Sequence, residues 1–109
     1  MAGDFLSTFE QFVLMALVRL RDDAYGRRIH EDVESRTETA IALGQVYVTL
    51  ERLETKGMVR SSMGEATAVR GGRAKRYFEI TAAGHSALDA TQRALSAMKG
   101  RLSFAGGRA

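Results

Sequence analysis

Apolar residues recur every three or four positions near the start of the chain, which is typical of a helix. They are Phe9, Phe12, Val13, Ala16, Leu17 and Leu20. Ser7-Thr8-Phe9-Glu10 fits a capping box, so this helix is expected to open at Ser7. Leu14, Met15 and Val18 make the remaining face apolar as well. We therefore expect one side of the helix to pack in the core and the other to contact a second subunit.

Two further amphipathic segments follow. Residues 24–36 predict a second helix that stacks Tyr25, Ile29 and Val33, and Gly26 within it indicates close approach by a neighbouring helix. A third helix is expected over residues 44–56, with Gly57 just beyond its end. The positions assigned to the core in this third helix are Val46, Leu50 and Leu53, and those assigned to the opposite sector are Gln45, Val48, Thr49 and Arg52.

The second half of the chain predicts a β-hairpin and a last helix. Strands are expected over residues 58–63 and 76–80, joined by a glycine-rich loop. Thr81 is expected to cap a helix over residues 82–102, and the tail at residues 106–109 to fray. An apolar stripe along this helix contains Leu88, Leu95, Met98 and Leu102.

This order of elements predicts a mainly α fold with a small β-hairpin. A polar-sided helix followed directly by a basic hairpin is typical of a winged helix-turn-helix. We therefore expect a winged helix-turn-helix DNA-binding domain over residues 1–81. Residues 82–109 are expected to form a C-terminal dimerisation helix and a frayed tail.

Size and composition narrow the class of protein. The 109 residues fit one domain, and the absence of cysteine excludes disulfides, thiol chemistry and cysteine-bound metal. The longest apolar run, Phe12 to Val18, is far below the roughly 20 residues that a membrane span requires. The first residues have no basic segment of the kind that opens a signal peptide. These features favour a soluble, cytoplasmic protein with no membrane partner.

Charge is distributed unevenly along the chain. Residues 1–57 carry 7 Lys/Arg and 10 Asp/Glu, whereas residues 58–109 carry 9 and 3, so the net charges are −3 and +6. The positive charge gathers around the predicted hairpin, where Gly71-Gly72 is followed by Arg73, Lys75 and Arg76. Such asymmetry favours an anionic partner at the hairpin.

The residues that could carry chemistry favour DNA binding over catalysis. His30 and His85 stand on different predicted helices, and the chain has no metalloprotease, nucleophile-elbow or P-loop motif. No enzyme activity, metal or cofactor is therefore expected. An α-helix fits the major groove of B-DNA, and Gln45, Thr49 and Arg52 are residue types that read base edges there. This interpretation requires Arg52 and the hairpin's Arg73 to face the same side of the molecule.

The chain also resembles the PadR family of transcriptional regulators from about Phe9 to Ala94. The supporting stretches are Phe12-Val13-Leu14-Met15-Ala16-Leu17, Asp23-Ala24-Tyr25-Gly26, Leu43-Gly44-Gln45-Val46-Tyr47, Leu50-Glu51-Arg52-Leu53-Glu54, Lys56-Gly57-Met58-Val59, Gly71-Gly72-Arg73 through Tyr77, and Thr81-Ala82-Ala83-Gly84. The single short C-terminal helix is similar to the compact branch of the family. Two departures are Val48, where many relatives have a polar residue or proline, and the long, weakly charged hairpin tip at residues 64–69.

The resemblance implies a homodimeric repressor. Two copies that place their third helices in successive major grooves would require a palindromic operator. The resemblance also implies that Tyr47, Arg73 and Lys75 approach the DNA; periodicity alone leaves Tyr47 open between a core-edge aromatic and a phosphate contact. The candidate DNA contacts are Gln45, Tyr47, Val48, Thr49, Arg52, Arg70, Arg73, Lys75 and Arg76. The candidate dimerisation residues, on the first and last helices, are Phe5, Phe9, Leu14, Leu88, Leu95, Met98 and Leu102.

The sequence is also compatible with two alternatives. Winged-helix domains also serve as protein-interaction modules that bind no DNA, because fold does not fix function. A small hydrophobic inducer could also release the repressor from its operator. Such a molecule would lie between the subunits against Phe5, Phe9, Met15, Met98 and Phe104, although the same side chains fit a plain dimer core.

Overall fold

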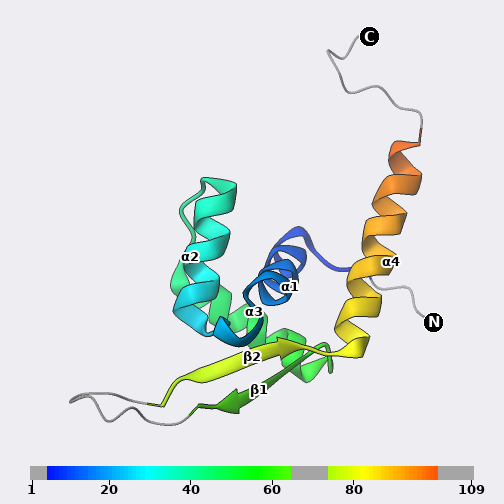
Figure 1. Ribbon diagram of the computed structural model, residues 1–109. Coiled ribbons are helices and arrows are strands. Elements are labelled where there is room, and N and C mark those ends of the chain that lie inside the picture. The colour runs from blue at the N-terminus through cyan, green and yellow to red at the C-terminus, as the bar shows by residue number, and fades with distance from the viewer. Residues whose placement is uncertain (1–4, 65–73, 101–109) are drawn as a thin grey trace.

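The computed structural model describes residues 5–64 and 74–100, and these form four α-helices with a two-stranded antiparallel hairpin (Figure 1). The elements are α1 Thr8–Leu20, the 3-10 turn η1 Arg21–Asp23, α2 Gly26–Thr37, α3 Leu43–Thr55, β1 Val59–Met63, β2 Arg76–Ile80 and α4 Ala82–Lys99. The predicted order of helices and strands is confirmed. No helix in the described ranges is long and apolar enough to cross a membrane.

The predicted capping box at the start of α1 is present. Ser7 Oγ accepts a hydrogen bond from the Glu10 amide at 3.1 Å, and Glu10 Oε1 accepts one from the Ser7 amide at 2.8 Å. Each side chain therefore satisfies a backbone N–H that the helix itself leaves without a partner. The sequence signal and the observed start of the helix agree.

The second helix begins two residues later than its periodicity predicts. Tyr25 stays extended, at φ −112° and ψ 164°, and forms an isolated antiparallel bridge with Tyr77 of β2. The Phe78 amide donates to the Ala24 carbonyl at 2.8 Å. Residues 24 and 25 therefore lie along the free edge of the hairpin, and this pairing holds the start of α2 beside β2.

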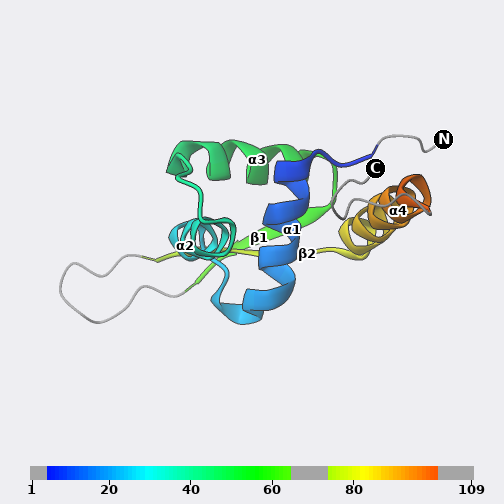
Figure 2. The same cartoon turned by 90° about the horizontal axis from the view of Figure 1, so that it is seen from above.

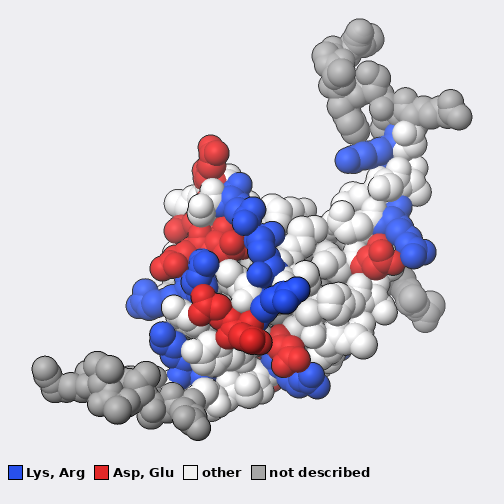
Figure 3. Space-filling model, in the orientation of Figure 1, with Lys and Arg blue, Asp and Glu red and all other residues white. Residues whose placement is uncertain are grey.

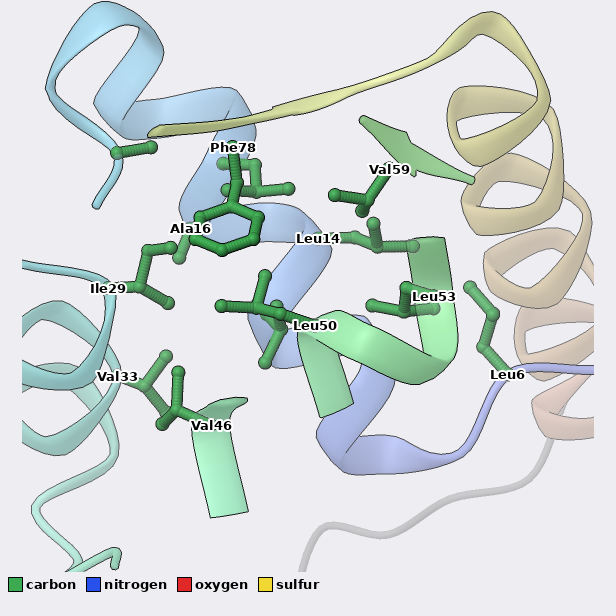
Figure 4. Close-up of a cluster of buried hydrophobic side chains, with 13 residues drawn as sticks. Leu6, Leu14, Ala16, Ile29, Val33, Val46, Leu50, Leu53, Val59 and Phe78 are labelled. Carbon is green, nitrogen blue, oxygen red and sulfur yellow. The ribbon is translucent and has the colours of Figure 1, made fainter. Parts of the chain in front are cut away.

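One hydrophobic core joins all these elements. The buried positions predicted for α3, Val46, Leu50 and Leu53, are fully inaccessible. Figure 4 shows Val46 beside Val33 and Leu50 toward Ile29 of α2, whereas Leu53 lies near Leu14 and Leu6. Phe78 and Val59 of the hairpin close the core on another side.

Leu14 belongs to this core, and its assignment to the dimer contact is wrong. Its side chain is 0% exposed within a single chain. The reason is the position of α1, which contacts α2, α3, β2 and α4 and therefore buries most of its circumference. Helical spacing indicated an apolar helix on all sides, but it could not tell which side an element of the same chain would cover.

Two buried carboxylates also hold α1 in place. Asp32 of α2 accepts from Arg19 of α1 and from Arg36 Nε at 3.1 Å, and Glu10 Oε2 accepts from Lys56 Nζ at 3.2 Å. Burial alone would raise the pKa of Asp32, but the hydrogen bonds and charges of the two arginines outweigh it and lower the pKa. The pKa of Glu10 is lowered in the same way, against burial, by its bonds to Ser7 and Lys56. Both carboxyl groups are therefore ionised structural links at neutral pH.

Candidate nucleic-acid interface

The helix-turn-helix formed by α2 and α3 has two helix N-termini without side-chain caps. Tyr25 precedes α2 and Ala42 precedes α3, and neither side chain accepts from the first turn of its helix. The first turns of α2 and α3 also contain no acidic residue. By contrast, Ser7 and Thr81 cap α1 and α4. Free backbone N–H groups at a helix N-terminus attract anions such as phosphate, so these two ends are suited to a polyanion.

The side of α3 that faces away from the core exposes three of the predicted DNA contacts. Gln45 and Arg52 are exposed, and 56% of Val48 is accessible. An amide, a guanidinium and a methyl-bearing side chain on one helix face can read hydrogen-bonding groups and thymine methyl groups in a major groove. The chemistry expected of this surface from the sequence is therefore available on it.

Thr49 does not lie on this surface, and its assignment to the DNA contacts is wrong. Only 3% of Thr49 is exposed. At 3.6 residues per turn, it lies only about 40° around the helix from buried Leu53 and about 60° from Val46. The core side of α3 is wide enough to include it. Thr49 therefore packs in the interior and cannot read DNA from this position.

Tyr47 lies at the junction of the two helices. Tyr47 is 40% exposed. A Cβ atom added to Gly26 would lie 2.6 Å from Tyr47 Cε1 and closer still to the Tyr47 hydroxyl. Gly26 therefore allows the Tyr47 ring to pack on the N-terminus of α2, which explains the glycine that the sequence marked as a close approach. The same contact brings the Tyr47 hydroxyl beside the uncapped first turn of α2.

Lys75 lies near the same helix end. Its Nζ atom lies 4.2 Å from the centroid of the Tyr25 ring, and Tyr25 packs edge-on against Tyr77 at 5.8 Å between centroids. A cation over an aromatic ring is held in place while it stays accessible to solvent. Lys75 is exposed. Of the predicted hairpin cations within the described residues, it is the one that can meet a phosphate. Arg70 and Arg73 lie outside the described residues.

Arg76 has a different role from the predicted DNA contact. Its guanidinium donates to Glu54 at 2.7 Å, to Glu51 at 3.3 Å and to the Ser61 hydroxyl at 3.1 Å. Arg76 shares its face of β2 with buried Phe78, because side chains alternate along a strand. It therefore fastens the hairpin to α3. The alternating pattern of β2 could have placed Arg76 on the face of Phe78 from the sequence, but not its pairing with Glu51 and Glu54 of α3.

Charge is mixed on the side of the molecule away from α3. Figure 2 shows α3 and the C-terminal end of α1 on opposite sides of the strands. On the face that Figure 3 presents, Lys and Arg side chains alternate with Asp and Glu over the described residues. Elsewhere in the described residues, ion pairs such as Arg28–Asp23 at 3.2 Å and Arg60–Glu79 at 3.0 Å join opposite charges. The face in Figure 3 therefore does not present a charge of one sign.

The last helix leaves apolar side chains without a cover in a single chain. Phe5 is 64% exposed, Leu95 47% and Met98 77%, whereas Phe9 and Leu88 are half-buried. Thr91 anchors α4 to the segment that precedes α1 by accepting from the Leu6 amide at 3.1 Å. Beyond that point α4 extends away from the rest of the fold (Figure 1). Leu102 lies outside the described residues.

Within residues 5–64 and 74–100, no three His, Asp or Glu side chains are grouped so that they could hold a metal ion.

Comparison with known proteins gives a consistent result. The model of the family described as "Transcriptional regulator PadR-like family" matches residues 13–90. A PadR family transcription regulator from Clostridium difficile R20291 is similar in structure, with a TM-score of 0.69 and 23% identity over 84% of this chain and 91% of that one. A PadR-like regulator from Bacillus cereus has a TM-score of 0.67 and 18% identity over 84% of each chain.

A third similar structure is the Orc1 protein of Aeropyrum pernix in complex with DNA. It has a TM-score of 0.61 and 24% identity over 83% of this chain, but only 26% of the Orc1 chain. At these identities the structures show a shared fold. No curated protein matches this chain.

Proposed function

This chain belongs to the PadR-like family of transcriptional regulators, and we propose that two copies of it bind one DNA duplex as a repressor, with α3 of each copy in the major groove. The observation that carries this proposal is the exposed side of α3, where Gln45, Val48 and Arg52 lie free of the core. The matched part of the Orc1 protein, which has the same fold, belongs to a structure in complex with DNA. That neighbour supports the proposal by analogy.

Each part of the surface has its own task in the proposal. Gln45, Val48 and Arg52 supply sequence preference through base edges. Tyr47, Lys75 and the hairpin cations Arg70 and Arg73 contact phosphates and set the register of the protein on the duplex. The uncapped N-termini of α2 and α3 add backbone N–H donors to the same task.

Dimerisation through α1 and α4 completes the proposal. Phe5, Leu95 and Met98 would be covered by the second copy, together with half-buried Phe9 and Leu88 and with Leu102. A two-fold dimer places its two reading helices in successive major grooves, about one helical turn apart. The expected operator is therefore palindromic. A small hydrophobic molecule held between the copies, against Phe5 and Met98, would act as an inducer by changing that spacing.

Binding to the gene's own upstream DNA tests this proposal. If each copy neutralises about four phosphates, the logarithm of the association constant should fall against the logarithm of the salt concentration with a slope of about −7. Footprinting of the same DNA should protect two half-sites. The measurement is a titration at several salt concentrations, with a scrambled duplex of equal length as control.

Three results would count against the proposed function. A slope near zero would remove the electrostatic part, and equal affinity for the scrambled duplex would remove sequence reading. A stable dimer that retards no DNA would instead favour a protein-interaction module.

A further inference from the structure

The turn between α2 and α3 is held by two side chains of α2. The Ile41 amide donates to Glu34 Oε2 at 2.8 Å, and the Ile41 carbonyl is 2.6 Å from His30 Nε2. Because a carbonyl oxygen only accepts hydrogen bonds, His30 Nε2 must carry the hydrogen. Both polar backbone groups of one turn residue are therefore satisfied by side chains.

His30 and Glu34 form one unit. They lie four residues apart on the same side of α2, and His30 Nε2 is 3.4 Å from Glu34 Oε2. Their side chains are partly exposed, at 21% for His30 and 35% for Glu34. Neither belongs to the hydrophobic core, so both can be replaced without opening a cavity.

This pair holds the chain immediately before the reading helix. Ile41 is followed by Ala42, the N-cap of α3, whose side chain makes no capping hydrogen bond. The direction in which the chain enters α3 is therefore not fixed by a cap of its own. Earlier in the same turn, Glu38 takes a left-handed conformation at φ 54°, so the chain bends sharply there. The hydrogen bonds to Ile41 then restrain the chain between this bend and the start of α3.

We infer that His30 and Glu34 are positioning residues for DNA reading: they clamp Ile41 and thereby set the angle at which α3 presents Gln45 and Arg52. This inference rests on the proposed function. A shift of the reading helix by about an ångström, or a rotation by about 10–20°, weakens recognition strongly, because hydrogen bonds to base edges are directional. The clamp thus acts on affinity through α3 without touching the duplex.

Two conservative and two disruptive variants test the clamp. Gln at position 30 can still donate to the Ile41 carbonyl, and Gln at position 34 can still accept from its amide. His30→Gln and Glu34→Gln should therefore bind the upstream DNA within about threefold of the original protein. His30→Leu and Glu34→Met keep the size but lose the hydrogen bond, and should each bind about tenfold more weakly.

A control variant separates positioning from general stability. Ser7→Ala removes the cap of α1, far along the chain from the turn, and lowers the melting temperature without touching the clamp. It should leave DNA affinity unchanged at a temperature where all the variants are folded. Equal losses in the conservative and disruptive variants would overturn the inference, as would unchanged affinity in His30→Leu and Glu34→Met.

Amide hydrogen exchange in the absence of DNA gives a second, independent readout. The Ile41 amide should exchange slowly in the original protein and in Glu34→Gln, and fast in Glu34→Met. Unchanged exchange at Ile41 would overturn the clamp. If the protein bound no DNA while the exchange result held, the proposed function would fail and the clamp would stand as a structural device only.

Discussion

Gly84→Ala is expected to lower the free energy of unfolding by about 2–3 kcal/mol, because the added methyl group has no space. A Cβ atom there would lie 2.7 Å from Ile80 Cγ1 and 3.2 Å from the Met58 carbonyl carbon, with the Met58 carbonyl oxygen closer still. Backbone atoms cannot rotate away as the end of a side chain can. The clash therefore has to move α4 as a whole.

The start of α4 cannot move freely either. The Thr81 amide donates to the Met58 carbonyl at 3.0 Å, and the Thr81 hydroxyl donates to the Gly57 carbonyl at 2.7 Å. These bonds fix α4 on the turn that joins α3 to β1. Thermal unfolding should show the loss as a fall of roughly 10–20 °C in Tm for a chain of this size.

Gly44→Ala is the matched control for this prediction. The substitution is the same and also lies in a first helical turn, but no atom lies within 4 Å of the added Cβ. Alanine favours the helix over glycine by at most about 1 kcal/mol, so the Tm of Gly44→Ala should stay level or rise. Equal behaviour of the two variants would contradict the tight packing of α4 on the hairpin.

Arg52→Ala is expected to weaken binding to the operator by at least about 30-fold while hardly changing binding to unrelated DNA. A guanidinium that donates two hydrogen bonds to a guanine contributes about 1–3 kcal/mol of discrimination, and a dimer loses two such contacts. Arg52→Lys keeps the charge but not the paired donors, and should lose most of the same selectivity.

Lys75→Ala should behave differently, because its proposed partner is a phosphate. Affinity should fall similarly for all sequences, and the salt slope of the dimer should become less negative by about 2. Arg93→Ala is the control, since Arg93 is an exposed cation on α4 that pairs with Asp89. Titration of all four variants on operator and scrambled DNA compares their losses. A uniform loss for Arg52→Ala would contradict base reading by α3.

Local signals in the sequence predicted most of the fold. The capping box at Ser7, the spacing of Val46, Leu50 and Leu53, and the cap at Thr81 are each confirmed. All three depend on neighbours within a few residues along the chain, and short-range hydrogen bonding and helical period determine them. The order of elements followed from them.

The corrections concern residues whose environment is set by distant parts of the chain. Leu14 is buried because α1 is covered on several sides, and Thr49 because the core side of α3 is wide. Arg76 is a basic residue in a basic stretch, yet Glu51 and Glu54 of α3 bind it. Charge counts along the chain cannot show such pairing. The contact of Tyr47 with Gly26 likewise joins α3 to α2 and needs the packed structure.

The central claim, that the exposed side of α3 faces DNA, has one direct test. The chain contains no cysteine, so a single introduced cysteine can carry an iron chelate that cuts nearby DNA strands. Glu51→Cys places it on the exposed side of α3, and Asp22→Cys places it on η1, on the far side of the hairpin. The expected result is two clusters of cuts about one helical turn apart from position 51 and only background from position 22. Cuts of equal strength from both positions, or from position 22 alone, would contradict it.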